Sequence, residues 1–131
     1  RFAQQEISKL RETTPVIIID FHAEATSEKM AFGWFVDGSV SAVVGTHAHI
    51  PTADARVLPE GTAYISDVGM TGSYESVIGM QIDSSVSRFL TGLPSRFEPA
   101  TDFPRLCAVI LDVDETTGLT RSIEPFVVDS Y

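Results

Sequence analysis

Two apolar, strand-like segments with one helical segment between them constrain the fold of this chain most strongly. Residues 16–21 form a continuous run rich in β-branched side chains, and residues 40–44 form a second, shorter run. Residues 27–36 lie between them and carry four apolar side chains at helical spacing, Met30, Ala31, Trp34 and Phe35. A helix that joins two strands predicts a βαβ unit with parallel pairing. We expect strand 16–21 to be covered on both faces and the apolar side of the helix to pack in the core.

The other periodic segments complete an α/β pattern. They predict a helix at 2–10, a strand at 62–68, a glycine-containing loop at 69–74, a helix from about residue 83 to Gly92, and a hairpin formed by 106–112 and 119–128. With 131 residues, the chain is long enough for one domain with a core and too short for two. There is no initiator methionine, and no capping residue precedes the first helix, so we expect the chain to be part of something longer.

Composition excludes some partners. A net charge of −9 argues against stable nucleic-acid binding, which needs clustered Lys and Arg. It does not argue against a small phosphorylated substrate, because a metal ion supplies local positive charge on an acidic surface. No apolar segment is long enough to cross a membrane, so we expect no membrane partner. The single cysteine, Cys107, lies in an apolar run and is expected to be buried, in a protein of the reducing cytoplasm.

All three histidines follow strand-like segments. His22 comes after the first segment, and His47 and His49 come after the second, preceded by Gly45. Because the carboxyl ends of parallel strands meet at one edge of a sheet, we expect these side chains to converge. On an extended segment, His-x-His points both rings to the same side, where they serve one metal ion or two neighbouring ions. Gly45 would let the backbone approach closely. The pattern predicts a metal site.

Four carboxylates also lie near predicted strand ends, namely Asp20, Glu24, Asp54 and Asp67. Each is a candidate either for a metal ligand or for an acceptor that orients a histidine ring. For Glu24 and Asp54 we favour the simpler interpretation of a solvated carboxylate. For Asp67 neither interpretation is favoured.

Three segments carry a family resemblance. Residues 19–29, with Asp-Phe-His-Ala-Glu, residues 43–49, with Gly-Thr-His-Ala-His, and residues 64–72 strongly resemble the YmdB-type metallophosphoesterases, bacterial members of the calcineurin-like superfamily. The resemblance implies an α/β fold that is part of a four-layer αββα sandwich. It also implies two divalent transition metals, iron or manganese, with zinc also compatible. The implied reaction is hydrolysis of small phosphodiesters, such as 2′,3′-cyclic nucleotides, by a hydroxide that bridges the metals.

The resemblance assigns the histidines residue by residue. His22 and His47 match ligands of one metal, and His49 matches a ligand of the other. The family's other ligands, and the histidine that protonates the leaving group, have no counterpart here, so no catalytic residue is assigned in this chain. We therefore expect residues 1–131 to be the C-terminal half of a single metallophosphoesterase domain. Such a half is expected to bind metal weakly and to turn over little on its own.

The loop after Asp67 is a candidate substrate contact. Its backbone amides and the hydroxyls of Thr71 and Ser73 are suited to a phosphate or ribose, so Asp67, Thr71 and Gly72 are candidates for substrate binding or for orienting a ligand. The alternative interpretation is a tight connection between a strand and a helix.

Two other functions stay open at this point. One is a mononuclear metal hydrolase of carbon–nitrogen bonds, which also uses His-x-His near a strand. The other is a non-catalytic metal-binding or regulatory module. A half-sandwich should expose apolar faces, so we also expect self-association into a homo-oligomer.

Overall fold

Sheet A carries the predicted βαβ unit. The computed structural model describes residues 1–129, and sheet A contains four strands in the order β1-β2-β4-β3. Their bounds are β1 (Ile18–His22), β2 (Ala42–Thr46), β3 (Arg56–Val57) and β4 (Ala63–Ile65). Strands β1 and β2 are parallel, as predicted, β4 is parallel to β2, and β3 is antiparallel to β4. Every residue of β4 is buried, and β2 is mostly buried.

Sheet B is the predicted hairpin with one short strand added. Strand β5 (Gly72–Ser73) pairs antiparallel with β6 (Pro104–Val113), which pairs antiparallel with β7 (Thr120–Asp129). The start of β7 is tied to sheet A, because the Thr120 hydroxyl donates a hydrogen bond to the Ser41 carbonyl oxygen at 2.6 Å. The turn before β7 passes close to the N-terminal part of the chain. A Cβ atom on Gly118 would lie 1.9 Å from the carbonyl oxygen of Pro15, so only glycine fits there.

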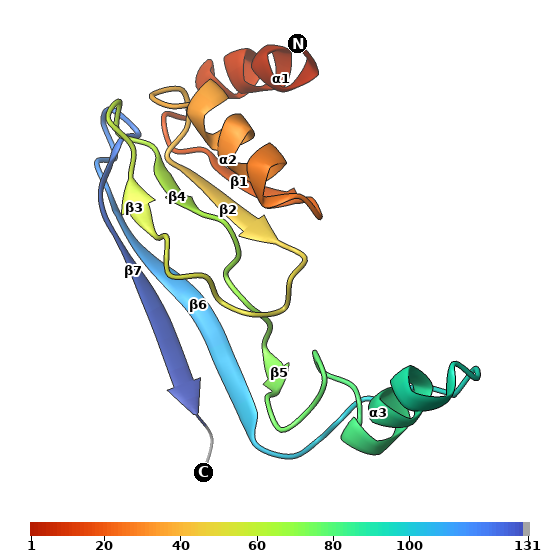
Figure 1. The fold of residues 1–131 in the computed structure, drawn as a ribbon. Coiled ribbons are helices and arrows are strands. Elements are labelled where there is room, and N and C mark those ends of the chain that lie inside the picture. The colour runs from red at the N-terminus through yellow and green to blue at the C-terminus, as the bar shows by residue number, and fades with distance from the viewer. Residues whose placement is uncertain (130–131) are drawn as a thin grey trace.

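The helices and sheets form layers (Figure 1). Helices α1 (Phe2–Arg11) and α2 (Thr26–Phe35) cover one face of sheet A, and sheet B lies on its other side. Helix α3 (Ile82–Thr91) lies apart, beyond the end of sheet B. The predicted α/β class is confirmed. The buried core lies between the first two helices and sheet A and consists of Ile7, Ile17, Val36, Val40, Val43, Leu58 and Tyr64.

Of the four apolar side chains of helix α2 that were predicted to face the core, only Met30 packs against it. The buried residues of the helix are Lys29 and Gly33, whereas Trp34 and Phe35 are 50% and 51% exposed. The reason is the close approach of Gly33 to the ring of Tyr64, where an added Cβ would lie 2.6 Å from Cδ2. This contact turns the aromatic residues outward, and the guanidinium of Arg56 packs over the Trp34 ring.

Strand β1 is not covered on both faces, contrary to expectation. It forms an edge of sheet A, and Ile18 is 57% exposed.

Helix α3 also leaves apolar side chains uncovered. It ends as predicted at Gly92, which has a φ of +68°. No helix among residues 1–129 is long and apolar enough to cross a membrane.

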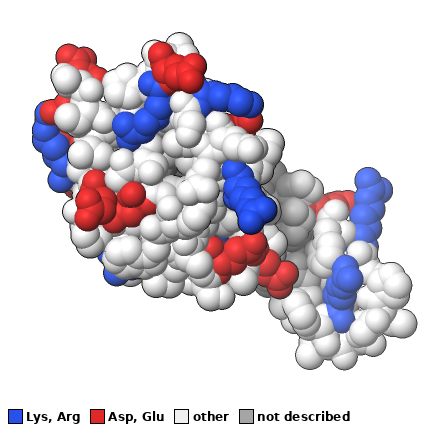
Figure 2. Space-filling view, turned by 90° about the horizontal axis from the view of Figure 1, so that it is seen from above, with Lys and Arg blue, Asp and Glu red and all other residues white. Residues whose placement is uncertain are grey.

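The surface charge is mixed. On the face seen from above in Figure 2, Lys and Arg side chains are interspersed with Asp and Glu rather than gathered into one basic patch. This distribution suits the overall acidic balance of the chain.

Gly45 provides a test of the packing between β2 and the segment after β4. A Cβ atom at this position would lie 1.9 Å from the carbonyl oxygen of Ser66, so the glycine is needed for this backbone contact. We expect Gly45→Ala to lower the free energy of unfolding by about 3 kcal/mol, measured by urea denaturation. Gly72→Ala is the matched control, because no atom lies within 4 Å of its added Cβ. If the two variants have equal free energies of unfolding, the close backbone contact of Gly45 with Ser66 does not matter for stability.

Candidate metal centre

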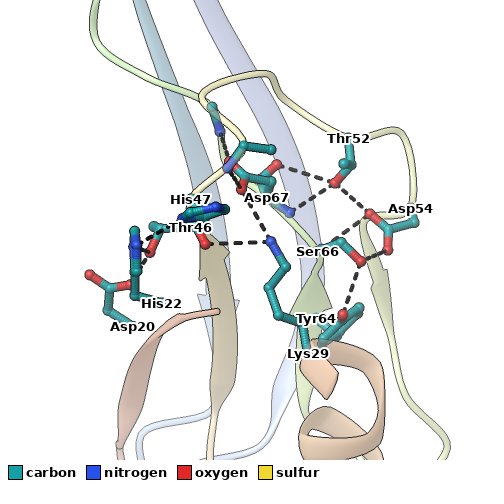
Figure 3. Close-up of polar contacts among 12 residues, drawn as sticks. Asp20, His22, Lys29, Thr46, His47, Thr52, Asp54, Tyr64, Ser66 and Asp67 are labelled. Atoms are coloured by element: carbon teal, nitrogen blue, oxygen red, sulfur yellow. Dashed lines mark hydrogen bonds and ion pairs between the residues drawn. The ribbon is translucent and has the colours of Figure 1, made fainter. Parts of the chain in front are cut away.

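Two histidines from neighbouring strands lie side by side at the carboxyl edge of sheet A (Figure 3). The parallel register pairs His22 with Thr46, so His47 is the next residue along the chain. The Nε2 atom of His22 lies 3.1 Å from the Nδ1 atom of His47. Their ring planes are inclined at 80°, with the centroids 4.9 Å apart. The expectation that the βαβ unit brings both residues to one edge is confirmed.

The hydrogen bonds around His22 define which ring nitrogen carries the proton. The Thr46 hydroxyl donates to Asp20 Oδ1 at 2.9 Å. Its oxygen therefore accepts from Nδ1–H of His22, at 3.1 Å. In the neutral ring, Nε2 of His22 then carries the lone pair and accepts a hydrogen bond from Nδ1–H of His47 at 3.1 Å. Asp20 thus acts as an acceptor that orients a histidine ring through Thr46, one of the two roles considered for it.

His49 makes a separate contact, with the carbonyl oxygen of Ile78. The φ angles of His47 and His49 are 132° and 65°, so the segment does not have the extended conformation on which the prediction that both rings point to the same side depended. Nδ1–H of His49 donates to the carbonyl oxygen of Ile78 at 2.9 Å. A carbonyl only accepts, so the proton is on Nδ1 and Nε2 is the nitrogen free to bind a ligand.

The paired histidines fit two positions in the coordination sphere of one metal ion. Two imidazole nitrogens bound to the same metal at about 2.1 Å lie about 3 Å apart, and His22 Nε2 and His47 Nδ1 have this spacing. Imidazole binds iron, manganese and zinc, so this donor pair does not select the metal. Within residues 1–129, no group of three or more His, Cys, Asp and Glu side chains is arranged to hold a metal ion.

Asp67 and Lys29 form a buried ion pair beneath the histidine segment. Lys29 Nζ lies 3.2 Å from Asp67 Oδ2, and the two side chains are 3% and 1% exposed. The same oxygen accepts the amide N–H of Ala48 at 2.6 Å, and Oδ1 accepts the amide N–H of Gly69 at 3.0 Å. Asp67 therefore contacts the backbone between His47 and His49 rather than an imidazole ring. Sequence reasoning missed Lys29, although Lys29, Gly33 and Val36 have the spacing of one helix face.

Asp54 is not the solvated carboxylate that we favoured. It accepts hydrogen bonds from the Thr52 hydroxyl at 2.6 Å and from the Ser66 amide N–H at 3.1 Å and hydroxyl at 2.5 Å. Burial raises the pKa of Asp54, but the hydrogen bonds from Ser66 and Thr52 outweigh it, and the pKa is lowered from its ordinary value of 3.8. Asp54 thus joins the loop after β2 to the end of β4. Glu24 is exposed, as expected for a solvated carboxylate.

The loop at 69–74 lies beside His49. The Met70 amide N–H donates to the His49 carbonyl oxygen at 3.2 Å. A cavity of about 120 Å³ next to it is lined by His49, Ile50, Met70, Tyr74, Ser76 and Ile78. Thr71 is exposed and Gly72 belongs to β5, and neither lines this cavity. Ser73 is buried, and its hydroxyl donates to the Asp102 carbonyl oxygen, so it is not free to meet a phosphate.

Cys107 is buried, as predicted, and its sulfur lies 3.0 Å from the Tyr74 hydroxyl. Burial and the hydrogen bond with Cys107 raise the pKa of Tyr74 to about 12. The phenol therefore stays protonated and donates to the carbonyl oxygen of His49 at 3.3 Å.

Solved structures define the class of protein. The fold is part of a metallophosphoesterase sandwich, and it matches a crystal structure described as a novel phosphatase from Mycoplasma pneumoniae with a TM-score of 0.89 and 39% sequence identity. The match covers 98% of this chain and 45% of that chain. A hypothetical protein from Thermus thermophilus matches with a TM-score of 0.86 and 43% identity, over 97% of this chain and 50% of that one.

The chain belongs to the family described as YmdB-like protein, whose model matches residues 1–126. It is 50% identical over 127 residues to the 2′,3′-cyclic-nucleotide 2′-phosphodiesterase of Bacillus subtilis strain 168. That match covers 97% of this chain and 48% of the relative. The chain thus spans about half the length of these relatives.

The lowered pKa of Asp54 predicts a pH-dependent contribution to stability. The contribution is fully present above pH 3.8 and is lost as the pH falls through the lower pKa of the folded state, because the unfolded chain takes up the proton first. We expect Asp54→Asn to cost about 1 to 2 kcal/mol at pH 7 and progressively less below pH 3.8, in urea unfolding. Glu24→Gln, at an exposed carboxylate, is the control. If Asp54→Asn lowers the free energy of unfolding by the same amount at pH 7 and below pH 3.8, the proposed contribution of the ionised Asp54 carboxylate is wrong.

Proposed function

We propose that this chain supplies one part of the active site of a metal-dependent phosphodiesterase that hydrolyses small phosphodiesters such as 2′,3′-cyclic nucleotides. One observation carries the proposal. His22 Nε2 and His47 Nδ1 lie 3.1 Å apart at the carboxyl ends of the parallel strands β1 and β2, where α/β enzymes place their chemistry. The membership of the chain in the YmdB-like family and its identity with a 2′,3′-cyclic-nucleotide 2′-phosphodiesterase support the choice of substrate class.

In this proposal His22 and His47 bind one divalent metal ion, and His49 binds a second. The ions, iron or manganese with zinc also compatible, would activate water and neutralise the charge that develops on the phosphoryl oxygens. The residues of this chain prepare the ligands. Asp20 and Thr46 hold the His22 ring with its lone pair on Nε2, and the Ile78 carbonyl does the same for His49.

The proposed site requires more ligands than these three imidazoles. By the family resemblance, the remaining metal ligands and the general acid come from a segment that has no match in these 131 residues. Thr71 and Gly72 stay proposed as substrate contacts, on the loop that Met70 joins to His49. Asp67 is proposed to act on the histidine segment through the backbone.

The direct test is manganese-dependent hydrolysis of a 2′,3′-cyclic nucleotide. The assay compares this chain with the product of its complete reading frame, and we expect substantial activity only in the complete product. In that product His22→Gln or His47→Gln should lower kcat/KM by about a hundredfold or more, because a metal ion contributes several kcal/mol to transition-state stabilisation. The double variant should lose no more than either single variant, because both ligands serve one ion.

Glu124→Gln, on the exposed part of β7, is the control and should leave kcat/KM unchanged. Full activity in the 131-residue chain would contradict the proposal that it supplies only part of the site. Activity in neither protein would contradict the substrate class and favour a non-catalytic metal-binding or regulatory module, or a metal hydrolase of another class.

We also propose that the chain self-associates as a homo-oligomer. Its apolar side chains include Phe2, Phe89 and Leu90, which are 76%, 85% and 81% exposed. Burying such side chains between copies is favourable. In sedimentation velocity, the weight-average sedimentation coefficient should rise with concentration, and Phe89→Ser with Leu90→Ser should reduce the rise. A monomer at every concentration would contradict this proposal.

A further inference from the structure

The segment that carries His47 and His49 has a backbone conformation that needs support. Both histidines have positive φ angles, 132° and 65°, in a region that side chains other than glycine rarely occupy. Such a conformation costs of order 1 to 3 kcal/mol per residue and persists only where the surrounding structure holds it. Both rings belong to the proposed site, so the groups that hold this backbone also determine where the rings lie.

The Lys29–Asp67 pair contacts the backbone on both sides of His47. Lys29 Nζ lies 3.4 Å from the carbonyl oxygen of Thr46, the residue before His47. Asp67 Oδ2 accepts the N–H of Ala48, the residue after His47, at 2.6 Å. The two side chains are joined to each other at 3.2 Å, so one ion pair connects α2, the end of β2 and the segment after β4 (Figure 3).

Fold stability alone does not account for this pair. The side chains are 3% and 1% exposed, so both charges have lost almost all their contact with water. Desolvation of this kind offsets most or all of the attraction, and apolar residues of similar size are often equally stabilising or better. The other hydrogen bonds of this pair go to the backbone around His47 and to Gly69. The pair therefore fixes the conformation of the backbone around His47, and this role accounts for burying two charges.

We propose that Lys29 and Asp67 are positioning residues. Their buried ion pair holds the peptide groups on either side of His47 and thereby places its Nδ1 atom against Nε2 of His22. As a consequence, the two nitrogens are already at the spacing of one metal ion before any ion binds. The value of this arrangement for catalysis rests on the proposed function, but the placement of the rings does not.

The test uses two double variants that leave no uncompensated buried charge. Lys29→Met with Asp67→Leu removes the ion pair and the acceptor for the Ala48 N–H. Lys29→Met with Asp67→Asn removes the charges but keeps an oxygen that accepts this N–H. The control is Thr120→Val, which removes a buried hydrogen bond to Ser41, at the opposite end of β2 from His47. Urea unfolding of the metal-free proteins measures how much each variant destabilises the fold.

Two readouts separate positioning from stability. The first is the ¹H–¹⁵N spectrum of the histidine rings, recorded without metal. Its signals can be assigned because the chain has three histidines. In the wild type, His22 and His47 should each show a proton held on Nδ1, whereas a loosened segment should show averaged ring signals. The second is manganese affinity, from the electron paramagnetic resonance signal of the free ion. Residues that orient metal ligands typically contribute about 10- to 100-fold in affinity.

We expect the Met/Leu variant to lose the ordered His47 signal and to bind manganese about tenfold or more weakly. The Met/Asn variant should lose less, and Thr120→Val should lose neither at comparable stability. If the Met/Leu variant folds and keeps both wild-type readouts, the inference is wrong. If it does not fold, the Met/Asn variant decides, because wild-type ring signals there would equally overturn the inference.

The outcomes also separate this inference from the proposed function. If the wild-type product of the complete reading frame binds no manganese but the ring spectrum depends on the pair, the positioning role stands and the proposed metal site fails. If manganese binds equally to all variants with unchanged ring signals, the metal site stands and the positioning role fails.

Discussion

The parallel register of β1 and β2 is the constraint on which the site depends. It places His22 opposite Thr46, so that the chain leaving β2 passes directly beside the end of β1. A shift of one residue would turn His22 to the other face of the sheet and remove its contact with His47. Burial of β2 favours this register, and Gly45, whose missing side chain lets the Ser66 backbone approach, fixes β2 against the segment after β4. The chemistry at the edge is thus a consequence of packing several residues away.

Much of the architecture could be predicted from the sequence because it depends on the spacing of apolar residues within short segments. The βαβ unit, the hairpin of β6 and β7 and the edge at which His22 and His47 meet all follow from runs of apolar residues and from chain order. The side of α2 that packs could not be predicted in this way. Gly33 faces Tyr64, which is 31 positions later in the sequence, and helical spacing gives no sign of that partner. The more apolar side of α2 therefore looked like the core side.

The polar part of the site was harder to predict for a related reason. The direction of His49 depends on two positive φ angles, which a single sequence of non-glycine residues does not reveal. Asp54 was interpreted as a solvated carboxylate and Lys29 was not singled out, yet each contacts a residue more than ten positions away in the sequence. Buried polar groups are satisfied by partners that only the folded chain brings together, so their roles are tertiary information.

The attachment of β7 to sheet A has a consequence for how this chain folds. The hairpin of β6 and β7 pairs segments that are neighbours in sequence, and it can form early. Its junction with sheet A, from Thr120 to Ser41, closes a loop of 79 residues. Closing such a loop loses chain entropy before the stabilising contacts between the two sheets have formed. We therefore expect docking of the two sheets to be slower than formation of the hairpin, and until it occurs the faces of both sheets are exposed to water and to other chains.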